Sequence, residues 1–196
     1  MARKYEWDYD NQQEKPCDYL WTFQFQPELM HDSPVVIEGF LTERQCDALL
    51  ARFDQETAMG SHKVNKFTSV PLLPDTDERL YRKVSRMLMQ TNARNWRYSL
   101  VGMLEPITMR QYVAGGRHNL HTDYIGGDLS KLSCSVLLSS PRDFTGGGLE
   151  FLHYDIGSVK RGDAVVFPGW MAHKVNPITK GKRTSLLAWC VGQRLI

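Results

Sequence analysis

The segment RHNLHTDY, residues 117–124, lies in the half of the chain where short β-strands are predicted. In a strand, residues i and i+2 project from the same face, so His121 and Asp123 can converge on one point while Thr122 turns away. His118 is separated from both by an odd number of residues and is expected to face elsewhere. A His-x-Asp pair alone does not define a metal site, and a further ligand is needed.

A second segment, FPGWMAHKV at residues 167–175, supplies His173 at the start of a late predicted strand that could lie beside the first. Two imidazoles and one carboxylate on one side of a metal leave the opposite positions open, as in non-haem iron(II) oxygenases. Zinc accepts the same donors together with a water, so the ligand types leave both metals open. The four other histidines are interpreted as structural: His31, His62, His118 and His153.

Arg183 follows His173 by ten residues, and Ser185 lies at i+2 on the same face of the last predicted strand. An inward guanidinium can grip a carboxylate through two parallel hydrogen bonds, and a nearby hydroxyl can add a third. Tyr112 precedes His121 by nine residues and could donate to the same ligand. Lys182 is the nearest rival anchor. These residues predict a binding site for a dicarboxylate cosubstrate beside the metal.

The residues from about 98 to 196 are predicted to form short strands separated by glycine, proline and polar turns. So many strands after a helical prelude favour an α+β fold, with a jelly-roll (double-stranded β-helix) core and N-terminal helices packed against one sheet. The glycine triplet 146–148 is interpreted as a turn leading into a strand that walls the pocket. The predicted strands cover residues 98–113 (with a bend at Glu105-Pro106), 117–122, 132–139, 149–152, 156–160, 163–167, 172–177 and 183–192.

The helical prelude is predicted from residue 34 to residue 97, and the jelly-roll core from 98 to 196. A short strand at 35–37 precedes a helix that a capping box of Thr42 and Gln45 opens and that runs to about Glu56. A second amphipathic helix is predicted from about 75 to 91. Residues 1–33 are expected to be a separate N-terminal arm, with an edge strand where Trp21, Phe23 and Phe25 alternate with polar residues.

Composition sets further limits on function. The chain has 196 residues, enough for one domain with a real core, and a formal net charge of only +2. That balance argues against nucleic acid or an acidic membrane surface as a partner. No apolar run is long enough to span a membrane, and residues 1–10 lack the apolar core of a signal peptide, so the cytoplasm is the expected location. The scattered Cys17, Cys46, Cys134 and Cys190 are expected to be reduced thiols.

The segment from Pro34 to Gly192 resembles the 2-oxoglutarate and iron(II) dioxygenases of the prolyl 4-hydroxylase-like group, most closely the bacterial and viral members. His121, Asp123 and His173 match the metal motif of that group. Arg183 matches its basic position ten residues beyond the second histidine, and Tyr112 matches a tyrosine that faces the cosubstrate. Animal collagen-type members usually carry lysine where Arg183 stands, so a collagen-like substrate is not implied.

The resemblance implies an enzyme that uses Fe(II), 2-oxoglutarate and O2, with ascorbate as a candidate reductant. It would hydroxylate a C–H bond and release succinate and CO2, with Arg183, Tyr112 and Ser185 around the cosubstrate. The implied substrate is an amino-acid residue, often proline, in a peptide or protein, and the alternative is a free amino acid or other small molecule. Two other classes stay open: a cupin-type metal enzyme that does not use 2-oxoglutarate, and a metal-binding jelly-roll module without activity. The oligomeric state is left open.

Overall fold

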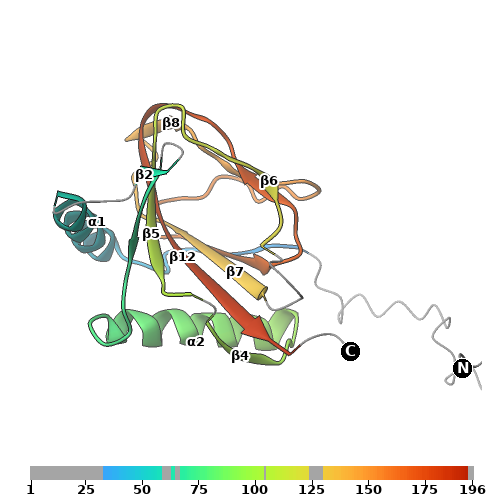
Figure 1. Cartoon of the computed structure of the whole chain (residues 1–196). Coiled ribbons are helices and arrows are strands. Elements are labelled where there is room, and N and C mark those ends of the chain that lie inside the picture. Colours follow the sequence, from blue (N-terminus) through green and yellow to red (C-terminus); the bar gives the residue numbers. More distant parts are fainter. Residues whose placement is uncertain (1–32, 59–62, 65–66, 104, 124–129, 194–196) are drawn as a thin grey trace, which may run out of the picture.

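A computed structural model describes residues 33–58, 63–64, 67–103, 105–123 and 130–193 of the chain. Within these residues two helices and twelve strands alternate along the sequence (Figure 1). Their order is β1 (Val35–Ile37), α1 (Glu43–Ala58), β2 (Lys63–Val64), β3 (Phe67–Pro71), α2 (Glu78–Asn95), β4 (Leu100–Met103), β5 (Thr108–Val113), β6 (His118–His121), β7 (Ser130–Leu137), β8 (Phe144–Gly146), β9 (Leu149–Phe151), β10 (Ala164–Pro168), β11 (His173–Val175) and β12 (Ile178–Gly192).

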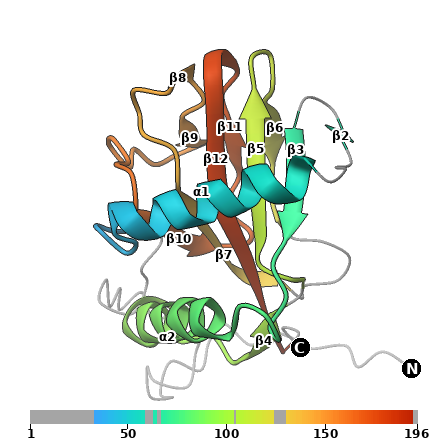
Figure 2. The ribbon, with the colours of Figure 1, turned by 90° about the vertical axis from the view of Figure 1, so that its left-hand side faces the viewer.

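The strands form two antiparallel sheets. The large sheet has the order β1-β10-β7-β12-β5-β3-β2, and β4 and β8 both pair with the long β12. The small sheet has the order β6-β11-β9. Both helices lie on one side of the large sheet, and α1 crosses in front of β5 and β12 (Figure 2). This arrangement confirms the predicted α+β jelly-roll, and the two sheets do not close into a barrel.

The main core lies between the helices and the large sheet. Phe53 of α1, Leu88 of α2 and Leu186 of β12 are each about 1% exposed and belong to one hydrophobic cluster. Cys46, Cys134 and Cys190 are buried free thiols in the same cluster, as expected, whereas Cys17 lies outside the described residues. The opposite face of the large sheet is therefore free to meet the small sheet. No helix of the described residues is long and apolar enough to cross a membrane.

Both predicted helices are present, but the predicted ends of the second helix are wrong. The capping box opens α1 as predicted, because Thr42 N–H donates to Gln45 Oε1 at 3.1 Å and Gln45 N–H donates to Thr42 Oγ1 at 3.3 Å. The second helix begins three residues later than predicted, since residues 73–77 form a hydrogen-bonded turn. It also continues to Asn95, because the side chain of the buried Asn92 binds the backbone of Tyr98 and closes the final turn.

One predicted strand is wrong, and three observed strands were missed. Residues 156–160 do not form a strand, because Gly157 has a φ of +65° and its N–H donates to Asp155 in a turn. Strands β2, β3 and β8 were not predicted. Strand β3 pairs with β5 along five residues, and this pairing makes the segment a strand although its own sequence has no clear strand pattern. The predicted edge strand at Trp21, Phe23 and Phe25 lies outside the described residues.

Candidate metal and cosubstrate site

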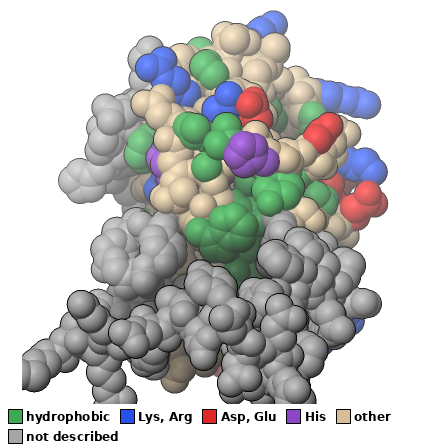
Figure 3. All heavy atoms as spheres, turned by 90° about the vertical axis from the view of Figure 1, so that its right-hand side faces the viewer, with side chains coloured by type: hydrophobic (Ala, Val, Ile, Leu, Met, Phe, Trp, Pro, Cys, Tyr) green, Lys and Arg blue, Asp and Glu red, His purple; other side chains and the backbone are tan. Residues whose placement is uncertain are grey.

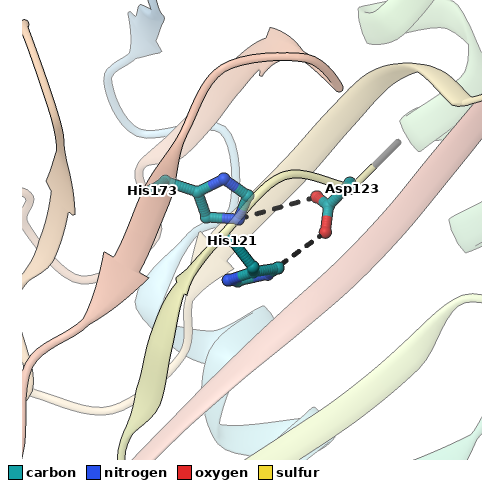
Figure 4. A group of neighbouring side chains, drawn as sticks. All are labelled: His121, Asp123 and His173. Carbon is teal, nitrogen blue, oxygen red and sulfur yellow. Dashed lines mark ion pairs between the residues drawn. The ribbon is translucent and has the colours of Figure 1, made fainter. Parts of the chain in front are cut away.

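Three predicted ligands meet where the small sheet faces the large one. His121 ends β6, and His173 begins β11 directly opposite it in the antiparallel register. Asp123 follows His121 by two residues, and its N–H donates to Gly169 O at 2.9 Å. The ligand atoms of the three side chains all lie within 4.8 Å of one another (Figure 4). Pairing of β6 with β11 thus brings together His121 and His173, which are 52 positions apart in the sequence.

Each ligand is oriented by a contact behind it. The Nδ1 atoms of His121 and His173 lie 2.8 and 2.9 Å from the backbone oxygens of Asn119 and Met171, so both Nε2 atoms point toward the carboxylate. His121 Nε2 lies 3.3 Å from Asp123 Oδ1, and His173 Nε2 lies 3.6 Å from Oδ2. Backbone oxygens behind ring nitrogens are the usual outer contacts of metal-binding histidines. The donor set and its support fit a divalent transition metal with open positions.

The charges of the triad suit a metal cation. Burial alone would raise the pKa of Asp123, but hydrogen bonds from His121 and Ser133 outweigh burial and hold the pKa at about 2. The hydrogen bond to Asp123 raises the pKa of His121, whereas burial lowers the pKa of His173. Asp123 is therefore ionised at neutral pH, which is the form that binds a metal. Ser133 donates to Asp123 Oδ2 at 2.6 Å, so this oxygen lies between Ser133 and His173, while Oδ1 faces His121.

The prediction that His118 faces away from the site is wrong. Its ring stacks on that of His121, with centroids 3.9 Å apart and planes 13° from parallel. The register explains the error, because His121 pairs with His173 and His118 pairs with Val175. The two residues of β6 are three positions apart, whereas their partners in β11 are only two positions apart. An extra residue of this kind is a β-bulge, and it reverses the alternation of faces. His118 therefore lines the site beside the metal ligands.

Arg183 is buried and has no ion-pair partner among the described residues. It is only 5% exposed, and burial lowers its pKa to about 10. Its neighbour Lys182 is exposed, which removes the rival anchor. Arginine is rarely buried without a partner, because desolvating the charge is costly unless an anion compensates it. Arg183 lines the same cavity as the metal triad, so a bound carboxylate is the compensation that fits.

Tyr112 and Ser185 line this cavity with Arg183, as the alternation along β5 and β12 predicts. Tyr112 lies directly across from Arg183 in the register, and its hydroxyl is 3.2 Å from His118 Nδ1. Ser185 Oγ is buried and has no hydrogen-bond partner in the part of the chain that the structure describes. An unsatisfied buried hydroxyl beside an unpaired cation is a suitable donor for a carboxylate ligand. The geometry thus brings all six predicted site residues to one cavity.

The glycine turn lies against the far side of Arg183. Gly146 and Gly147 have φ values of +80° and +67°, and a Cβ on Gly147 would lie 3.0 Å from Arg183 Cδ and 2.1 Å from Ile178 Cδ1. These positions therefore need glycine both for conformation and for space. Leu149, at the start of β9, lines the cavity as predicted. A second hollow of about 270 Å³ adjoins Arg183 on this side.

Several further residues of the cavity were not predicted, among them Arg110, Ser133 and Trp189. Arg110 shares a strand face with Tyr112 at i−2, and Trp189 shares one with Ser185 at i+4, so alternation alone could have identified both. Ser133 lies in the fully buried β7, where no face is distinguished by polarity. Its role depends on the position of Asp123, which sequence alone does not give.

An open groove of about 640 Å³ adjoins the metal ligands. It shares His118 and His121 with the inner cavity. On the side of the molecule that carries β6, histidine and hydrophobic side chains lie together at the surface (Figure 3). The groove gives a ligand larger than the cosubstrate a route to the metal. Its described lining consists of Phe67, Gly115, Arg117, His118, Asn119, Leu120 and His121.

Comparison with known families agrees with this geometry. Residues 107–191 match the family model described as the 2OG-Fe(II) oxygenase superfamily, and the match contains the whole triad and Arg183. A PKHD-type hydroxylase of Sphingopyxis alaskensis is 31% identical over 122 residues, which cover 55% of this chain and 55% of the relative. The chain thus matches about half the length of this relative.

Solved structures share the fold. A prolyl-4-hydroxylase of Pseudomonas putida has a TM-score of 0.68 at 18% identity, covering 83% of this chain and 94% of that one. A prolyl hydroxylase of Trichoplax adhaerens, solved with a peptide fragment of the hypoxia inducible factor oxygen degradation domain, has a TM-score of 0.67 at 17% identity. It covers 82% of this chain and 84% of that one. At these identities the likeness establishes the jelly-roll fold and leaves the substrate to be argued separately.

Proposed function

Because residues 107–191 match the model of the 2OG-Fe(II) oxygenase superfamily, we propose that the protein is an iron(II) and 2-oxoglutarate dependent dioxygenase that hydroxylates a C–H bond. Succinate and CO2 would be its other products. The observation that carries the proposal is the shared cavity of the metal triad and the buried, unpaired Arg183. A zinc cupin or a structural metal module would have no use for a buried cation beside an open metal site.

The residues would divide the work as follows. His121, Asp123 and His173 would hold the iron, which together with 2-oxoglutarate would supply the oxidising chemistry for attack on a C–H bond. Arg183 binds the far carboxylate of the cosubstrate, and the unsatisfied hydroxyl of Ser185 donates to it. Tyr112 lines the same cavity, and its hydroxyl, which lies 3.2 Å from His118 Nδ1, would donate to the same carboxylate. The protein thus contributes positioning and a partly dry cavity to chemistry that the cofactors supply.

A residue such as proline in a peptide or protein is the substrate that we propose. The open groove beside His118 and His121 supports it, because a chain segment can lie there while one side chain reaches the metal. The peptide bound to the Trichoplax adhaerens enzyme of the same fold also supports it. The alternative is a free amino acid or another small molecule.

Two measurements test the activity. Anaerobic addition of iron(II) and 2-oxoglutarate should give a weak charge-transfer band at about 500 nm, the region expected for such chelates. Succinate should then form in air across a panel of proline-containing peptides and free amino acids, with the product located by mass spectrometry. Arg183→Ala should weaken 2-oxoglutarate affinity much more than iron affinity, and Lys182→Ala serves as its control, since it removes an exposed charge one position away. Absence of both the band and succinate in the wild-type protein would refute the proposal.

A further inference from the structure

A second arginine lines the cavity and is left without a role by the proposed function. Arg110 lies on β5, two residues before Tyr112 and on the same strand face. In the sheet register it stands between Ser69 of β3 and Ser185 of β12. The cavity that it lines also contains His121 and Asp123. A positive side chain therefore faces the metal site from the wall that β5 contributes.

The contacts of Arg110 hold it in place without neutralising it. Its Nε donates to Ser69 Oγ at 3.3 Å, and its guanidinium carbon lies 4.8 Å from the ring centre of Phe67 and 6.0 Å from that of Trp189. Among the described residues no carboxylate pairs with it, and its two terminal nitrogens make no hydrogen bond. By contrast, Arg52, Arg82 and Arg161 each pair with an acidic side chain.

The guanidinium of Arg110 is thus held in position and is free to bind an anion. Stacking on aromatic faces fixes the guanidinium plane, and the free terminal nitrogens match the two oxygens of a carboxylate. Trp189 also places the receptor close to the metal, since it contacts both Arg110 and Asp123. A substrate carboxylate held at Arg110 would therefore lie in the same cavity as the metal, and only Trp189 separates Arg110 from the metal ligand Asp123.

We propose that Arg110 binds a carboxylate of the substrate, so that the enzyme acts on anionic substrates. The inference rests on the proposed function, in which the cosubstrate already occupies Arg183, the other unpaired arginine of the cavity. Arg183 is 5% exposed, which suits a cosubstrate that is enclosed before the reaction. Arg110 is half-buried, which suits a substrate that enters and leaves in each turnover. The carboxylate could come from a free amino acid or from an acidic side chain next to the target residue in a peptide.

The test compares acids with their neutral amides. The full chain is loaded with zinc(II) in place of iron and with saturating 2-oxoglutarate, and binding is measured by calorimetry. One arm uses free amino acids and their α-amides. The other uses acetylated, amidated tripeptides that carry a central proline next to Asp or to Asn. We expect at least one acid in one arm to bind about tenfold or more tightly than its amide, as a charge-assisted pair predicts. The arm that shows the preference identifies the source.

Variants assign the preference to Arg110. Arg110→Met keeps an unbranched side chain against Phe67 and should reduce the preference below about twofold, whereas Arg86→Met, which removes an exposed charge on α2, should keep it. Ser69→Ala removes only the hydroxyl behind Arg110 and should weaken the preference even if Arg110→Met folds poorly. The affinity for 2-oxoglutarate should survive Arg110→Met and fall in Arg183→Met.

Three results would overturn the assignment. These are equal binding of acids and amides in both arms, an undiminished preference in Arg110→Met, and a loss of 2-oxoglutarate affinity in Arg110→Met as large as in Arg183→Met. Repeating the titrations without zinc and 2-oxoglutarate separates this inference from the proposed function. A chain that binds neither of them but still prefers acids through Arg110 would refute the function and keep the anion site.

Discussion

Replacing Arg183 by methionine should stabilise the ligand-free protein while abolishing its response to 2-oxoglutarate. Burial lowers the pKa of Arg183 from 12.5 to about 10, so the fold disfavours the charged form. At about 1.4 kcal/mol for each pKa unit, that difference corresponds to a cost of about 3 kcal/mol near neutral pH, where the side chain is charged in both folded and unfolded chains. Methionine has a similar length and no charge, so part of this cost should return as stability.

The assay is urea unfolding of the zinc-loaded protein with and without 2-oxoglutarate. The wild type should gain about 2.7 kcal/mol at a cosubstrate concentration 100 times its Kd, and Arg183→Met should gain almost nothing. Lys182→Met is the control, because an exposed neighbour should change neither value. The reasoning fails if Arg183→Met is several kcal/mol less stable than the wild type and still responds to 2-oxoglutarate. Such a result would mean that Arg183 is a packing residue with another partner.

Three further predictions concern the metal ligands. Asp123→Ala should abolish iron binding and leave a folded chain by circular dichroism, and retained full activity would remove Asp123 from the site. Ser133→Ala should weaken metal affinity by about 10-fold to 100-fold, because it frees the carboxylate that Ser133 orients, and an unchanged titration would contradict this. Metal affinity should fall as the pH is lowered from about 8 to about 6, since protons compete for His121, whose pKa is raised. Titrations at several pH values should then show proton release on binding that increases toward the acid end.

Much of the fold could be predicted because its signals are local. The capping box of Thr42 and Gln45 acts within one turn and fixes the start of α1. Strand β3 could not be predicted, because it becomes a strand by pairing with β5, about 40 residues later in the chain. The end of α2 was misjudged for a similar reason, since Asn92 closes the helix through a contact with the backbone of Tyr98.

The site shows the same division. Alternation correctly grouped Arg183 with Ser185 within β12, and it also grouped His121 with Asp123, which lies two residues beyond the end of β6. It failed at His118, because the rule assumes an unbroken register and β6 contains a bulge. A bulge is a property of two paired strands, so nothing in the sequence of one strand marks it. The two most informative features, the missing partners of Arg183 and of Ser185 Oγ, also become visible only when all neighbouring side chains are known.

The charges that line the cavity connect the proposed cosubstrate with the proposed substrate class. Three side chains there carry formal charges: Asp123 −1, and Arg110 and Arg183 +1 each. With an iron(II) ion the cavity would hold a net charge of +3, and the two carboxylates of 2-oxoglutarate would reduce it to +1. The remaining positive charge belongs to the half-buried Arg110. In a partly buried space this charge is costly unless an anion binds to it. A substrate with one carboxylate would bring the assembled site to neutrality, whereas a neutral substrate would leave Arg110 desolvated and unpaired. Discrimination against neutral substrates would then come mainly from that penalty, and substitution of Arg110 should relax specificity as well as weaken binding.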